Sequence, residues 1–209
     1  MYIAKIGSDT VDSEYYANLT GEPYLYYELK QVAKLTLSGF SPVEIRAKIK
    51  DDNLFQSATN KSINKLLSAT LKRVAVLDET MLNLLLHGSL QTSKLVALIV
   101  IMKTNRLFME FIEEVYQEKV RLGDRDLNSR DFRIFFNNKA EQSSKVAGWQ
   151  ESTINKLSQV YSKILFEAGL INNTRKKMLT PPTLDEELLV PLRKIGDQRL
   201  IIAMTGGRM

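Results

Sequence analysis

Basic side chains at helical spacing are the groups of this sequence best suited to chemistry, and that chemistry is binding to a polyanion. Between residues 59 and 77 the chain has four basic residues and no acidic one, and its apolar positions recur as in an amphipathic helix. The basic residues are Lys61, Lys65, Lys72 and Arg73. We expect them to contact the phosphates of duplex DNA, as lysine and arginine do in most protein–DNA complexes.

Two polar residues of the same helix, Asn64 and Ser68, are of types that reach base edges. A helix-turn-helix unit presents its second helix to the major groove, so that helix needs an apolar inner side and a polar, basic outer side. The segment from about 23 to 77 meets this requirement as a three-helix unit. The alternative is that the basic residues form the solvated face of an ordinary bundle helix.

A second helix-turn-helix unit is predicted around residues 146–157. A short helix ends at Gly148, the bulky Trp149 anchors the turn as a core residue, and small polar residues open a longer helix to about Ala168. The residues of this helix expected to contact DNA are Ser152, Thr153, Lys156, Gln159 and Lys163.

Beyond Gly169 a basic segment of about ten residues lies between two short apolar stretches. A winged-helix domain passes in this way from its recognition helix to a short β-hairpin. The sequence therefore predicts a wing whose tip, Arg175, Lys176 and Lys177, contacts the DNA backbone. The alternative is a solvated loop, since basic loop tips are common.

Catalytic groups are scarce. The chain has no cysteine, which excludes disulfides, thiolate catalysis and cysteine-bound zinc, and His87 is its one histidine. Glu110, Glu113, Glu114 and Glu118 share the outer face of one predicted helix, and we interpret them as a solvated acidic face that points away from DNA. We expect a protein that is not an enzyme and holds no metal or cofactor.

The bulk composition fits this interpretation without proving it. The net charge is +5 with a pI near 9.3, which suits a polyanionic partner but also occurs without one. The longest apolar run, residues 95–102, is far shorter than the roughly 20 residues of a membrane span. The N-terminus lacks the pattern of a secretory signal. We therefore expect a cytoplasmic protein without membrane contact.

Spacing and capping signals predict an all-α fold. A helix is expected from Pro23 to Gly39, and a second begins at Ser41, where Glu44 completes a capping box. The last residues, 205–209, are expected to fray.

The predicted organisation has three parts. These are an N-terminal helical domain with the first helix-turn-helix (1–79), a central packing segment (80–124) and a C-terminal winged-helix-like domain (125–209).

The sequence resembles the BrxA family of bacteriophage-exclusion (BREX) defence systems, from about residue 15 to 171. Short segments carry the resemblance by their order and spacing. They are Leu19-Thr20-Gly21-Glu22-Pro23, Glu44-Ile45-Arg46, Asn53-Leu54-Phe55-Gln56, Ile101-Met102-Lys103, Leu107-Phe108, Phe111, Trp149, Ser152-Thr153 and Glu167-Ala168-Gly169-Leu170.

The resemblance implies a monomeric, all-α protein that binds duplex DNA and acts beside a methyltransferase, an ATPase and other BREX components. The family's motif fixes no base-reading residue, so none is transferred. Two alternatives stay open. One is a scaffold that docks other defence components; the other is an RNA-binding protein like the antitermination factor NusB, with bases stacked on Tyr24, Tyr26 or Tyr27.

Overall fold

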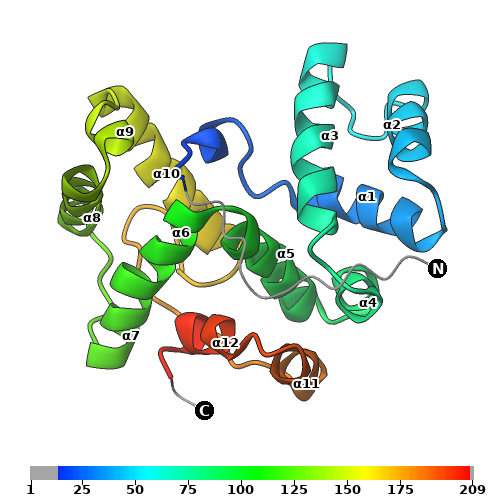
Figure 1. Ribbon diagram of the computed structural model, residues 1–209. Helices are drawn as coiled ribbons and strands as arrows, with labels where there is room; N and C mark the ends of the chain where they lie inside the picture. The colour runs from blue at the N-terminus through cyan, green and yellow to red at the C-terminus, as the bar shows by residue number, and fades with distance from the viewer. Residues whose placement is uncertain (1–13, 208–209) are drawn as a thin grey trace.

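The computed structural model describes residues 14–207, and within this range the chain forms helices and loops (Figure 1). No strand occurs among these residues, so the predicted all-α class is confirmed. The elements are η1 (Asn18–Thr20), α1 (Tyr26–Leu37), α2 (Pro42–Asp51), α3 (Asn60–Val74), α4 (Glu79–His87), α5 (Leu90–Thr104), α6 (Arg106–Phe111), η2 (Ile112–Gln117), α7 (Glu118–Leu122), α8 (Ser129–Gln142), α9 (Ser144–Ala147), α10 (Glu151–Glu167), α11 (Glu186–Lys194) and α12 (Gln198–Thr205).

The helices form two groups joined by a central pair. Figure 1 shows α1, α2 and α3 on one side of the molecule and α8, α9 and α10 on the other, with α5 and α6 between them. α4 packs on α1 and α5, α11 packs on α4, and α12 packs on η2. Apolar side chains from these elements join one core cluster. The boundaries at residues 79 and 124 stay a prediction.

The first group shows how local sequence sets the helix ends. Ser41 and Glu44 form the predicted reciprocal capping box of α2. Gly39, at φ +85°, takes the left-handed conformation that ends α1 without strain. The predicted start at Pro23 is wrong by three residues: Leu25 has φ +51°, which is not helical, and α1 begins at Tyr26.

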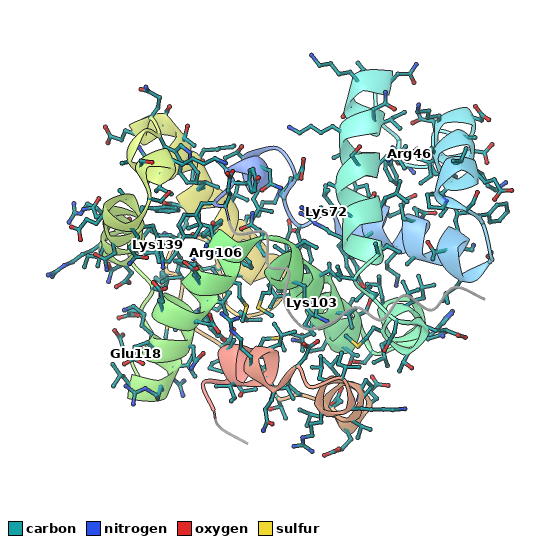
Figure 2. All side chains as sticks on the ribbon, viewed as in Figure 1. Arg46, Lys72, Lys103, Arg106, Glu118 and Lys139 are labelled. Atoms are coloured by element: carbon teal, nitrogen blue, oxygen red, sulfur yellow. The ribbon has the colours of Figure 1, made fainter. Side chains whose placement is uncertain are left out.

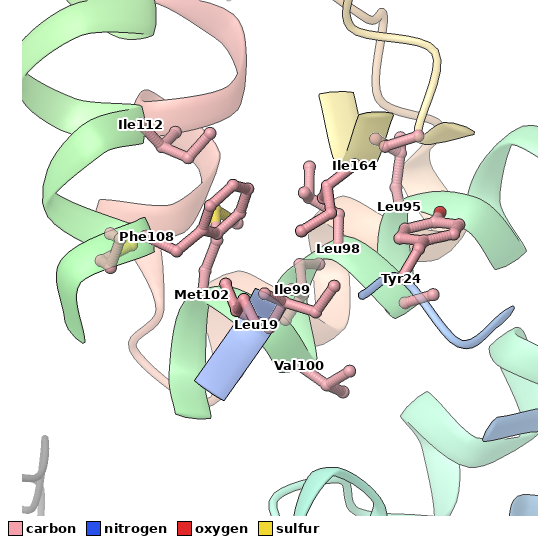
Figure 3. Packing of buried hydrophobic residues seen from close by; sticks show 14 of the residues in the cluster. Leu19, Tyr24, Leu95, Leu98, Ile99, Val100, Met102, Phe108, Ile112 and Ile164 are labelled. Carbon is pink, nitrogen blue, oxygen red and sulfur yellow. The ribbon is translucent and has the colours of Figure 1, made fainter. Parts of the chain in front are cut away.

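The centre of the core is α5, whose residues from Leu95 to Met102 are all buried. Figure 3 shows its side chains among residues of η1, α6 and α10, such as Leu19, Phe108 and Ile164. A helix enclosed on every side needs apolar residues all around, which explains the uninterrupted run. No helix formed by residues 14–207 is long and apolar enough to cross a membrane.

The basic segment after Gly169 does not form the predicted β-wing. Only isolated bridges occur there, without a strand. The side chain of Asn173 accepts hydrogen bonds from the backbone N–H groups of Arg175 and Lys176, at 3.0 and 2.7 Å. This bonding closes a compact turn, and the flanking stretches pair only at single residues, Ile171 with Leu179 and Met178 with Asp126. The wing prediction is therefore wrong, and the segment is a loop.

The C-terminal segment is more ordered than predicted. Residues 198–205 form α12, and Thr205 and Gly206 are buried. An added Cβ at Gly206 would lie 2.4 Å from Val120, so only glycine fits at this contact. The expectation of a frayed end is wrong for residues 205 and 206; residues 208 and 209 lie outside the described range.

Candidate nucleic-acid interface

Lys61, Lys65, Ser68 and Lys72 form a single exposed stripe along α3. Their spacing of four, three and four residues keeps them on one side of the helix over about 16 Å. The opposite side of α3 is buried in the core. None of the three lysines has a carboxylate partner in the part of the chain that the structure describes. The α3 stripe is therefore a row of uncompensated cations, with the exposed Asn64 beside it.

Arg73 does not belong to this stripe, although the sequence grouped it there. Its side chain is 3% exposed and donates hydrogen bonds to the backbone oxygens of Glu22, Pro23 and Tyr24, at 2.6, 2.8 and 3.1 Å. Burial lowers the pKa of Arg73 to about 10, so the guanidinium stays charged at neutral pH. Its donors are already used inside the fold, which gives Arg73 a structural role in place of the expected phosphate contact.

The residues before α1 connect the two helical groups. η1 packs on α10, while the carbonyls that follow it bind Arg73 of α3. Lys65 lies over this segment: its Nζ would be 1.9 Å from a Cβ at Gly21. Lys72 lines a small cavity of about 130 Å³ together with Glu14, Asn18 and Arg106. Lys65 and Lys72, the two lysines nearer the C-terminal end of α3, therefore lie next to the segment before α1 that joins the two helical groups.

α10 carries a weaker version of the same pattern. Ser152, Lys156, Gln159 and Lys163 are exposed at the same four–three–four spacing, whereas Thr153 is half-buried beside them. Lys163 lies 3.6 Å from the carboxylate of Glu167. A stripe with two lysines, one of them paired, offers less positive charge than α3.

The basic loop divides into two parts. Arg175 and Lys176 are exposed, as expected. Lys177 folds back instead, with its ammonium 5.8 Å from the centre of the Phe132 ring on α8. The loop therefore presents two cations to solvent and holds the third against the helical group.

The expected solvated acidic face is an ion-pair network. Each of its carboxylates has a cationic partner; the pairs are Glu110–Lys139, Glu113–Arg199, Glu114–Lys139 and Glu118–Arg121. Lys139 is 2% exposed and lies near Arg106, which also binds Glu110 (Figure 2). Burial acts to raise the pKa of Glu110, but hydrogen bonds from Lys139, Arg106 and Tyr15 hold it below its usual value. These paired charges repel phosphate less than free carboxylates would.

Sequence reasoning missed a polar groove between α8 and α10. It has a volume of about 670 Å³ and is lined by residues from both helices and by Lys177. Those from α8 and α10 are Ser129, Phe132, Arg133, Asn137, Glu151, Ile154, Asn155, Ser158, Gln159 and Ser162. Polar residues at four-residue spacing, Ser129–Arg133–Asn137 and Glu151–Asn155–Gln159, are the signal that could have indicated it.

Two of the three tyrosines predicted as alternative platforms for base stacking make contacts within the fold. Tyr24 is 2% exposed and donates a hydrogen bond to the carbonyl of Lys94. The ring of Tyr26 stacks on that of Tyr24, at 5.9 Å between centroids. Tyr27 alone of the three is well exposed, at 47%.

Comparison with known proteins gives consistent relatives. A model of the BrxA family matches residues 13–196. A protein of Bacillus cereus (strain H3081.97) named BREX protein BrxA is 39% identical over 184 residues, which are 88% of this chain and 92% of the relative. A protein of Escherichia coli O9:H4 (strain HS) with the same name is 23% identical over 197 residues, covering 94% and 92%.

A solved structure shares the fold. It is described as the crystal structure of an uncharacterized protein from Magnetospirillum magneticum, and it matches with a TM-score of 0.80 at 22% identity. The match covers 92% of this chain and 99% of that one.

Proposed function

Because the chain belongs to the BrxA family of bacteriophage-exclusion (BREX) phage-defence systems, we propose that it is a DNA-binding component that acts without catalysis of its own. The observation that carries the proposal is the α3 stripe. Its lysines are exposed, lie on one side of a helix and have no carboxylate partners among the described residues. Such a row of positive charges is complementary to the negative DNA backbone, and proteins bind DNA largely by neutralising its phosphates.

The binding mode that we propose is tolerant of sequence and uses both helical groups. The α3 stripe supplies most of the charge, with Asn64 and Ser68 near base edges. A second surface combines the α10 stripe and the exposed loop residues Arg175 and Lys176. We propose that the protein acts as a cytoplasmic monomer beside other BREX components, with the methyltransferase and ATPase as its candidate partners.

A competition titration tests the nucleic-acid class. A labelled duplex bound by the full chain is displaced with unlabelled duplex DNA, single-stranded DNA or RNA of equal length. We expect the duplex to displace best, because it alone offers two phosphate rows to the two helical groups. If RNA displaces best, the NusB-like alternative replaces the proposal. If no duplex binds and a partner protein is pulled down in a salt-sensitive way, the scaffold alternative replaces it.

A further inference from the structure

The groove between α8 and α10 is open because small side chains lie where the helices could otherwise meet. Ser158 and Ser162 line it, and each hydroxyl donates to a carbonyl of its own helix, at 2.9 Å. These hydroxyls therefore form no bridge to α8. Phe132 of α8, which is buried, and Ile154 of α10 also line the groove, so apolar side chains lie beside the polar ones.

The walls carry polar groups that the fold leaves unused. Arg133 and Asn137 of α8 and Asn155 and Gln159 of α10 are exposed, and none of their side chains has a hydrogen-bond partner within residues 14–207. Asn173, in the neighbouring loop, contrasts with them, since its side chain binds backbone N–H groups. The groove is thus lined by one guanidinium and three side-chain amides that form no hydrogen bond within the described part of the chain.

Lys177 adds a second cation at this groove, from a backbone position that the loop holds in place. Its backbone has φ +45°, a left-handed conformation that residues other than glycine seldom adopt. Hydrogen bonds on both sides hold it there: its N–H donates to Asn173 at 3.1 Å, and its carbonyl accepts from Leu127 at 3.2 Å. Its ammonium lies over the Phe132 ring, 5.8 Å from the ring centre. With Glu151 as the one acidic lining residue, the groove is positive overall.

We propose that this groove binds one nucleotide of an unpaired strand, with its phosphate on Arg133 and Lys177 and its base edge on the amides of Asn137, Asn155 and Gln159. Guanidinium and ammonium groups are the usual phosphate partners, and side-chain amides pair with the donors and acceptors of base edges. A duplex is recognised by a convex element that enters its grooves. A concave site of about 670 Å³ has the size of a small-ligand site and fits a single nucleotide instead.

This inference rests on the proposed nucleic-acid function and adds unpaired nucleotides to its substrate. DNA and RNA strands share the chemistry, so the test includes both. The probes are a labelled single-stranded oligodeoxynucleotide, an oligoribonucleotide of the same sequence, and a duplex. The variants are Arg133→Ala and the double variant Asn137→Ala, Asn155→Ala. Matched controls on α8 are Arg130→Ala and Asn138→Ala, exposed residues that do not line the groove.

We expect each groove variant to weaken binding of at least one single strand about tenfold or more, with little change for the duplex, because charge-assisted and amide hydrogen bonds are lost. The strand that responds identifies the source of the nucleotide. All replaced side chains are exposed, so the thermal unfolding midpoints of the variants are expected to equal that of the wild type. Equal midpoints show that weaker binding does not result from misfolding. The inference is overturned if the groove variants behave like their controls, or if duplex and single strand weaken equally.

Failure of the inference and failure of the proposed function give different results. A charge-reversed α3 stripe reports on duplex binding, and the groove variants report on single strands. Loss of duplex binding with the stripe variant but no effect of the groove variants removes the inference alone. Groove-dependent binding of a single strand without any duplex binding removes the proposed function alone.

Discussion

Charge reversal of Lys61, Lys65 and Lys72 together is expected to weaken duplex binding about 100- to 1,000-fold. Each lysine is exposed and free of a carboxylate partner among the described residues, so each is available to a phosphate. Three exposed phosphate contacts of about 1–1.4 kcal/mol each give about 3–4 kcal/mol, which corresponds to this range. The loss is expected to be similar for different DNA sequences, because phosphate contacts carry no sequence information.

The control for this variant reverses three other basic residues, so the net charge changes by the same amount at a different place on the surface. Lys34, Arg125 and Lys194 are exposed and lie away from the α3 stripe, on α1, between α7 and α8, and on α11. Their combined reversal is expected to cost less than about tenfold, since it acts only through the long-range field. Fluorescence anisotropy with a labelled duplex measures both variants. Equal losses would mean that overall charge, and not the α3 stripe, determines binding.

Replacement of Arg73 by methionine is expected to lower the free energy of unfolding by about 3–5 kcal/mol, which is a large part of a typical domain's stability. The buried guanidinium serves three backbone carbonyls in the segment that links the two helical groups. Without it these acceptors lose their partner, and the bond to the Tyr24 carbonyl is one that is buried from water. Arg73→Lys is expected to cost less, about 1–2 kcal/mol, because it keeps the charge but not the planar fork of donors.

The neighbouring Lys72 provides the matched comparison. Lys72→Met removes an exposed cation and is expected to change stability by less than about 0.5 kcal/mol while weakening DNA binding. Arg73→Lys is expected to show the opposite pattern, with lower stability and unchanged binding by the folded protein. Urea denaturation and duplex titration of both variants test the assignment. It fails if Arg73→Lys is as stable as the wild type and binds duplex less tightly.

Capping and periodicity were enough to predict most helices of this fold. Ser41 and Glu44 specify the start of α2 through contacts three residues apart, and Gly39 specifies the preceding turn. The apolar run of α5 indicated burial before any partner was known. These predictions succeeded because their causes are local in sequence.

The placement of individual cations depends on contacts that are distant in sequence. Arg73 is one residue from Lys72 and shares its charge, but the carbonyls that bury it belong to residues about 50 positions earlier. The partners of Glu110 and Glu113 lie on α8 and α12, so a face that looked solvated is paired. Helical spacing identifies which residues share a side, but not what covers that side.

The predicted wing failed for a related reason. A basic segment between two apolar stretches is compatible with a hairpin or with a loop; here Ile171 and Leu179 form only an isolated bridge, and Met178 bridges to Asp126 outside the segment. The groove beside it was missed because it needs two helices and the fold of this loop. The sequence of α8 or of α10 alone does not indicate the groove.

The salt dependence of duplex binding by the unmodified protein tests the central claim most directly. If about five to seven phosphates are neutralised, a plot of log binding constant against log salt concentration is expected to be linear with a slope of roughly −5 to −6. Titration of a labelled duplex at several salt concentrations gives this slope. A slope near zero, or no binding at low salt, would contradict the claim that the basic stripes bind DNA.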